Sequence, residues 1–128
     1  PECNDNPYGY KFSWAPRGVL LASRNSAKNW EDGKVVDIQG INLFARENVK
    51  DDHFEGVGDL EWYCNRDSHM FVDIYKNEGL KGVQTLIRGT YRYKGWCVTM
   101  KMIADLELTT QESMDIAGKP YLDFMKKK

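Results

Sequence analysis

Regular spacing of hydrophobic residues predicts the first elements of this chain. From Tyr8 to Trp14, aromatic residues occupy every second position, a period typical of a strand with one solvated face. Beyond Pro16, apolar residues recur near helical spacing as far as Trp30, which predicts a helix that begins at Pro16 and stops at Gly33. The inward face of this predicted helix comprises Val19, Leu20, Ala22, Ser23, Ala27 and Trp30.

The middle of the chain contains two strand patterns around a segment without a clear period. Lys34 to Ile38 is short and rich in β-branched residues, which favours a strand, and Gly40 then permits a turn. The segment from Asn42 to Asp52 could form one or two helical turns. Gly58 to Tyr63 is the next predicted strand.

A helix, a strand and another helix are predicted in the rest of the chain. Asn65 is predicted to cap the first of these helices, which ends at Gly79. Side chains alternate between two faces from Val83 to Tyr93, which is the clearest strand pattern in the chain. The spacing of apolar residues over 94–108 predicts the last helix. The apolar positions are Met70, Phe71, Ile74 and Tyr75 in the first helix, and Trp96, Val98, Met100, Ile103 and Leu106 in the last.

Together these elements predict an α+β domain in two layers. The simplest arrangement is a single, mostly mixed sheet with the helices packed on one face. The chain has 128 residues of near-average composition, enough for one hydrophobic core. Residues 109–128 are polar apart from a short amphipathic stretch.

Charge and hydropathy exclude several partner classes. The net charge is −1 and both signs are interspersed, which does not indicate nucleic acid or an anionic membrane as the main partner. The run from Lys126 to Lys128 is more typical of a solvated tail. No apolar run approaches the about 20 residues of a membrane span, and no signal peptide is visible. The chain begins at Pro1 rather than methionine, as expected of a processed or excised piece.

The cysteines and known catalytic motifs do not identify a reaction centre. Cys3, Cys64 and Cys97 are odd in number and lack CxxC spacing, which argues against a disulfide framework and a zinc site and favours a reducing compartment. His53 and His69 are isolated from the cysteines, so no metal site is expected. The patterns GxGxxG, GxxxxGK[ST] and GxSxG are absent, and catalytic residues are therefore not assigned.

Arginines are the conspicuous candidates for binding. Arg17 and Gly18 open the first predicted helix, where a cation is unfavourable unless an anion meets it. A guanidinium at that position suits a carboxylate or phosphate, and Gly18 permits close approach. Arg66, Arg88 and Arg92 are further candidates. For each of the four, an exposed or structurally paired arginine is the alternative. The other conspicuous residues, the aromatics of residues 8–14 and Cys97, Met100 and Met102, are predicted to serve in packing.

Four blocks of sequence are distinctive: "NPYGYKFSWAPRGVLLA" (Asn6 to Ala22), "DGKVV" (Asp32 to Val36), "YCNRDS" (Tyr63 to Ser68) and "IRGTYRYKGWC" (Ile87 to Cys97). In order and spacing they resemble the saccharopine dehydrogenase family, specifically its L-glutamate-forming branch. The third block has Cys64 where the family usually has proline. The resemblance assigns residues 1–108 to a substrate-binding and dimerisation domain and residues 109–128 to a linking segment.

The resemblance implies a role in lysine metabolism. Enzymes of this family oxidise saccharopine with NAD or NADP to glutamate and 2-aminoadipate 6-semialdehyde. They carry an N-terminal Rossmann domain, which this chain lacks, followed by the α/β domain that it resembles. The implied partners are a saccharopine-like tricarboxylate, the Rossmann domain of a longer parent and a second copy, with no nucleic acid and no membrane. The isolated chain is expected to bind no cofactor and to be inactive. The expected compartment is the cytoplasm, with mitochondria as the alternative.

The resemblance also transfers a short list of site residues. Arg17 corresponds to the arginine that contacts a saccharopine carboxylate, and Ile38, Gln39 and Gly40 correspond to a segment that touches substrate mainly through its backbone. Two other functions remain open. One is a relative of the carboxynorspermidine or carboxyspermidine dehydrogenase type, and the other is a non-catalytic dimerisation or interaction module.

Overall fold

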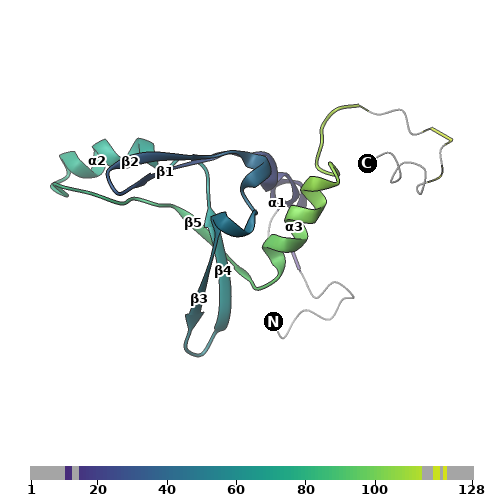
Figure 1. Cartoon of the computed structure of the whole chain (residues 1–128), viewed down its shortest axis with the longest axis horizontal. Coiled ribbons are helices and arrows are strands. Elements are labelled where there is room, and N and C mark those ends of the chain that lie inside the picture. The colour runs from purple at the N-terminus through teal and green to yellow at the C-terminus, as the bar shows by residue number, and fades with distance from the viewer. Residues whose placement is uncertain (1–10, 13–14, 114–116, 119, 121–128) are drawn as a thin grey trace.

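Two separate antiparallel sheets form the framework of the described part of the chain, which comprises residues 11–12, 15–113, 117–118 and 120 of a computed structural model (Figure 1). β1 (Ala27–Glu31) and β2 (Lys34–Ile38) make a two-stranded ribbon. β3 (Val49–Phe54), β4 (Gly58–Cys64) and β5 (Gly89–Tyr93) make the second sheet, with β4 in the centre.

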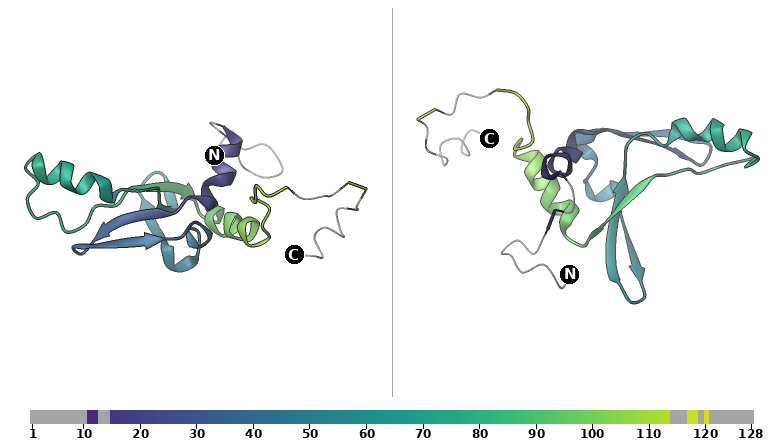
Figure 2. Two further views of the ribbon diagram at one scale, coloured as in Figure 1. Left: turned by 90° about the horizontal axis from the view of Figure 1, so that it is seen from above. Right: turned by 180° about the vertical axis from the view of Figure 1, so that it is seen from behind.

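Within the described residues, three α-helices lie around these sheets. They are α1 (Pro16–Leu20), α2 (Val72–Asn77) and α3 (Trp96–Asp105). α2 runs along the β1–β2 ribbon, and together they extend from the rest of the structure; we call these three elements the arm (Figure 1). α1 and α3 lie side by side at the opposite end, as Figure 2 shows from two further directions.

The α+β class predicted from the sequence is confirmed, but the single mixed sheet is wrong. Short turns join β1 to β2 and β3 to β4, and a hairpin makes its two strands antiparallel. Isolated bridges, Lys28 with Asp67 and Trp30 with Leu86, join the ribbon to neighbouring segments in place of a continuous ladder. The chain therefore closes two small sheets instead of extending one.

The first predicted helix is wrong beyond its first turns. α1 ends at Leu20, a 3-10 turn covers Leu21–Arg24, and the last part of the predicted helix is strand β1. Asp32 and Gly33 both have positive φ, 50° and 76°, which is the geometry of a two-residue hairpin turn. The helix stop predicted at Gly33 is therefore wrong, because an Asp-Gly pair also favours a two-residue hairpin turn.

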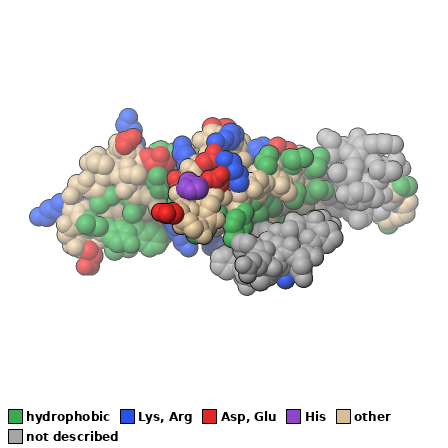
Figure 3. Space-filling view, turned by 90° about the horizontal axis from the view of Figure 1, so that it is seen from below, with side chains coloured by type: hydrophobic (Ala, Val, Ile, Leu, Met, Phe, Trp, Pro, Cys, Tyr) green, Lys and Arg blue, Asp and Glu red, His purple; other side chains and the backbone are tan. Residues whose placement is uncertain are grey.

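The next helix and strand are shorter than predicted. α2 begins at Val72, after a 3-10 turn over His69–Phe71, and Asn65 does not cap it. Most of its predicted apolar face is exposed, with Met70 at 61% and Ile74 at 51%. Figure 3 shows hydrophobic side chains on the surface of the arm, and mixed charges at the tip of the β3–β4 hairpin.

Several local predictions agree with the structure. β2, β4 and α3 lie where the pattern placed them, within two or three residues at each end. Of the predicted strand from Val83 to Tyr93, the second half forms β5, whereas Leu86 makes only the bridge to Trp30. The ambiguous segment forms 3-10 turns at Gly40–Asn42 and Arg46–Asn48 and then enters β3. The strand predicted over residues 8–14 lies, except for 11 and 12, outside the described residues.

The core lies between α3 and one face of the larger sheet. Phe44 packs edge-on against Tyr63 and Trp96, with ring centroids 4.8 Å and 5.2 Å apart, and Tyr63 stacks on Trp96. The N-terminus of α3 is capped from β4, because the buried Glu61 carboxylate accepts the backbone N–H of Cys97 at 2.5 Å. Surrounding core residues are Ala27, Ile38, Leu43, Val49, Cys64 and Met100.

Candidate functional site

Arg17 lies in the first turn of α1 and its side chain is exposed. Pro16 occupies the first helical position, where its missing N–H costs no hydrogen bond. Gly18 has open space around it, since a Cβ built there would meet no atom within 4 Å. The helix start is therefore accessible around Arg17, as the sequence argument required.

The Ile38–Gly40 segment follows the end of β2, and its three residues have different surroundings. Ile38 is 8% exposed and belongs to the core, which leaves its backbone as the part that can contact a ligand. Gln39 is exposed, and its carbonyl accepts the N–H of Asn42 at 2.9 Å. Gly40 is buried against the backbone of Ser23 and Arg24.

The structure thus brings the Ile38–Gly40 segment against the turn that follows α1. A Cβ on Gly40 would lie 2.6 Å from the carbonyl carbon of Arg24, so only glycine allows this approach. The same turn is tied to the end of α3, because Ser23 Oγ lies 3.2 Å from Thr109 Oγ1 and Arg24 Nη1 donates to the Thr109 carbonyl. α1, the turn after β2 and the end of α3 form one connected region.

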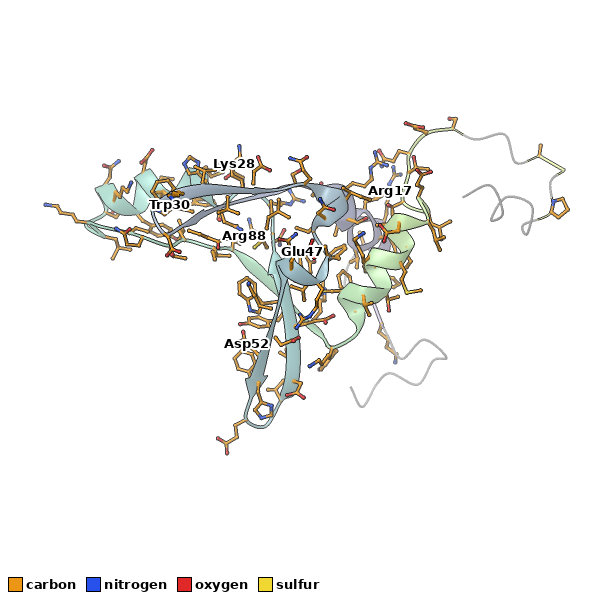
Figure 4. The ribbon with its side chains drawn as sticks, in the orientation of Figure 1. Arg17, Lys28, Trp30, Glu47, Asp52 and Arg88 are labelled. Atoms are coloured by element: carbon orange, nitrogen blue, oxygen red, sulfur yellow. The ribbon has the colours of Figure 1, made fainter. Side chains whose placement is uncertain are left out.

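The other conspicuous arginines do not converge on Arg17. Arg88 is exposed on the segment before β5, and Figure 4 shows it well apart from Arg17. Its carbonyl accepts the N–H of Asn65 at 2.7 Å. Arg66 is exposed in the left-handed region, with φ of 61°. Arg92 is half-buried, and its guanidinium carbon lies 4.7 Å from the ring centroid of Trp96.

The "YCNRDS" block joins the arm to the larger sheet through a buried polar network. Asn29, which is fully buried, donates from Nδ2 to Cys64 Sγ at 2.8 Å, and its Oδ1 accepts from Ser68 Oγ at 3.2 Å. Asn65 donates to Thr90 Oγ1 across the sheet. Cys64, at the family's proline position, therefore supplies an acceptor that proline lacks. This block serves as a structural joint.

The two described cysteines are unsuited to thiolate chemistry. Burial raises the pKa of the Cys97 thiol well above its ordinary value, and the Glu61 carboxylate raises it further. Burial also raises the pKa of Cys64. Cys97 and Met100 are buried, which confirms their predicted packing role, whereas Met102 is 61% exposed and that prediction is wrong. Within the described ranges, no three His, Cys, Asp or Glu side chains are grouped as metal ligands.

We expect the buried thiols to react slowly with alkylating reagents. In a Cys3→Ser variant, iodoacetamide at pH 8 should modify Cys64 and Cys97 at least about 100-fold more slowly than a free thiol, because both are buried and protonated. Mass spectrometry over time measures the rate, and the same protein in guanidinium should react fully. Modification at the free-thiol rate under native conditions would contradict the buried placement.

A groove of about 870 Å³ lies beside α1, between this helix, α3 and β5. Val19, Leu20, Met100 and Ile103 provide apolar surface, while Tyr91, Tyr93 and Trp96 provide aromatic surface and Lys11, Arg92 and Lys94 provide charge. Its volume lies in the range of small-molecule sites. Sequence reasoning did not identify this groove, because its walls come from segments far apart in the chain.

These observations define a small α+β domain with an exposed arginine on its first helix and an adjacent cationic groove. In the described part of the chain, no helix has both the length and the apolar character of a membrane span. The family model for the saccharopine dehydrogenase C-terminal domain matches residues 1–127, and the chain belongs to this family. The resemblance stated from the four sequence blocks is thereby confirmed.

Individual relatives agree with this assignment. Saccharopine dehydrogenase [NADP(+), L-glutamate-forming] of Saccharomyces cerevisiae is 42% identical over 121 residues, which is 94% of this chain and 26% of the relative. Bovine (Bos taurus) mitochondrial alpha-aminoadipic semialdehyde synthase is 41% identical over 113 residues, 88% of this chain and 12% of that protein. The solved structure of apo saccharopine dehydrogenase (L-Glu forming) from Saccharomyces cerevisiae matches with a TM-score of 0.75, at 42% identity, over 94% of this chain and 26% of its own. The chain thus spans about a quarter of the length of the yeast relative.

Proposed function

We propose that this chain is the substrate-binding part of a saccharopine dehydrogenase that forms L-glutamate. The parent enzyme would oxidise saccharopine to glutamate and 2-aminoadipate 6-semialdehyde with NADP, the cofactor named for the yeast relative. The observation that carries the proposal is 42% identity to that relative over 94% of this chain. Because the sequence holds no dinucleotide fingerprint, the cofactor would bind elsewhere in the parent, and the isolated chain would not catalyse.

Arg17 is the proposed contact for one substrate carboxylate. Its exposed guanidinium can donate two parallel hydrogen bonds to a carboxylate, which fixes orientation as well as position. Ile38, Gln39 and Gly40 would contribute backbone contacts from the neighbouring turn. In this arrangement the domain orients the secondary amine carbon of saccharopine toward the nicotinamide, which is a positioning task.

The wider assignments follow from the same family membership. We propose residues 1–108 as the substrate-binding and dimerisation domain and residues 109–128 as a linking segment. The proposed partners are the N-terminal Rossmann domain of the parent and a second copy of the enzyme. The proposed compartment is the cytoplasm, with mitochondria as the alternative because the bovine relative is named as mitochondrial.

Calorimetric titration tests the role of Arg17. Saccharopine is titrated into the full-length enzyme, with cofactor present, and into its Arg17→Ala and Arg17→Lys variants. We expect Arg17→Ala to lose about 2 kcal/mol of binding free energy, because a charge-assisted pair is removed. Arg17→Lys should lose less, since the charge remains but the bidentate geometry does not.

Lys81→Ala provides the matched control, because Lys81 is exposed on the segment that follows α2. Its affinity should equal that of the wild type. Equal affinity in Arg17→Ala would remove Arg17 from the site and contradict this part of the proposal.

A further inference from the structure

Two cations at the C-terminal end of β5 line the groove beside α1. Arg92 is in β5 and Lys94 directly follows the end of that strand, and both side chains line the groove. No Asp or Glu is among the described residues that line the groove. The groove wall formed by β5 is therefore cationic.

The acidic neighbours of these cations also bind other groups. Glu61 is opposite Arg92 in the sheet, but its carboxylate accepts the N–H of Cys97 at 2.5 Å. Asp51 is 3.9 Å from Lys94 Nζ, while Arg46 holds the same carboxylate at 2.6 Å. Arg92 and Lys94 thus keep much of their capacity to bind an anion.

Arg92 also has an unsatisfied hydrogen-bond donor. Its Nε is buried, and no acceptor in the described part of the chain lies within hydrogen-bonding distance. The guanidinium carbon lies 4.7 Å from the Trp96 ring centroid, and this cation–π contact supplies no hydrogen-bond acceptor for Nε. Buried donors in folded proteins are normally paired, so Nε of Arg92 is available to an acceptor that enters the groove.

Apolar surface separates this cationic wall from α1. Val19 of α1 and Met100 of α3 both line the groove and are buried, at 5% and 3% exposed. Leu20 lines the groove as well, and Arg17 is three residues before it, on the same side of the helix. The groove therefore offers cations at two places with aliphatic surface between them.

We propose that this groove binds a small aliphatic molecule that carries more than one carboxylate. Arg92, assisted by Lys94, binds one carboxylate, the aliphatic chain lies over the apolar surface, and Arg17 binds a second carboxylate. This inference rests on the proposed function, since saccharopine is such a molecule. It adds Arg92 and Lys94 as residues that determine how many carboxylates the bound molecule must carry.

Ligand titration of the 128-residue chain, followed by NMR of its amide and tryptophan indole signals, tests the proposal. The probes are glutarate, which has two carboxylates, and butyrate, which has one, at constant ionic strength. Glutarate should bind at millimolar concentration and more tightly than butyrate. Arg92→Gln should weaken glutarate binding about tenfold and Lys94→Gln several-fold, because each removes a charge-assisted contact.

Two controls separate binding from folding. Lys81→Gln removes an exposed cation outside the groove and should leave binding unchanged. Thermal unfolding of each variant, followed by circular dichroism, shows whether Arg92→Gln remains folded, and the exposed Lys94 provides an independent variant if it does not.

The outcomes distinguish this inference from the proposed function. Glutarate binding that is lost in Arg17→Gln but unaffected by Arg92→Gln and Lys94→Gln would overturn the inference and leave the proposed role of Arg17 standing. Binding that depends on Arg92 and Lys94 but not on Arg17 would overturn the placement of the second carboxylate on Arg17 and contradict the proposed role of Arg17. No binding of glutarate to the folded chain, or equal binding of butyrate, would overturn the inference.

Discussion

Replacing Gly40 by alanine is expected to lower the free energy of unfolding by about 3 kcal/mol. An added Cβ would lie 2.6 Å from the carbonyl carbon and 2.7 Å from the carbonyl oxygen of Arg24, and 2.9 Å from the carbonyl oxygen of Ser23. All three are backbone atoms and cannot rotate away. The turn after β2 would have to separate from the turn after α1, which also loosens the contact with Thr109.

Gly18→Ala is the matched control for this substitution. Gly18 is helical and a Cβ there meets no atom within 4 Å, so alanine should raise stability by about 0.5–1 kcal/mol. Urea denaturation of the three proteins, followed by tryptophan fluorescence, measures both effects. Equal stability of Gly40→Ala and the wild type would show that the close approach of the two turns is incorrect.

The second large effect is expected for Asn29→Asp, which should destabilise the protein by about 3 kcal/mol or more at pH 7. The substitution keeps the shape of the side chain but removes the donor to Cys64 Sγ and to Glu31 Oε1. It also places a carboxylate at a position with 0% exposure, close to the Glu31 carboxylate. Neither change can be relieved by solvent.

The loss of stability caused by Asn29→Asp should depend on pH. Burial raises the pKa of the introduced carboxyl above its unfolded value of about 3.9. Stability relative to the wild type is therefore highest below that value and falls as pH rises through the folded pKa. Asn25→Asp is the control, because Asn25 is exposed and its change should stay within about 0.5 kcal/mol. Denaturation at pH 4 and pH 7 measures the difference, and a pH-independent effect would contradict the buried placement of Asn29.

Local sequence patterns correctly predicted the elements in which intrinsic secondary-structure preference and tertiary contacts favour the same structure. β2 consists of β-branched and charged residues that suit a strand, and α3 carries a helical stripe that packs on the core. The first helix was overextended because Ala27 and Trp30 fit a helical stripe as well as a strand. Hydrogen bonds from Trp30 to Leu86, far along the chain, select the strand.

The site was predictable only in part, for a related reason. Arg17 was identified from the cost of a cation at a helix start, and the structure leaves it exposed on α1. The groove could not be predicted in this way, because Leu20, Arg92 and Met100 come from three separate elements. The same holds for the unpaired Nε of Arg92, which depends on how β5 packs against Trp96.

The sequence by itself therefore determined the family, because the residue types and order of four blocks are specific. It also determined the elements in which the spacing of apolar residues fits only one type of secondary structure. Tertiary structure alone decided the number of sheets, the end of α1, the exposure of α2 and the position of the groove. The physical reason is that the period of apolar residues shows only which side of a segment is apolar. Contacts between distant segments, such as Gly40 with Arg24 and Glu61 with Cys97, determine which element packs against that side.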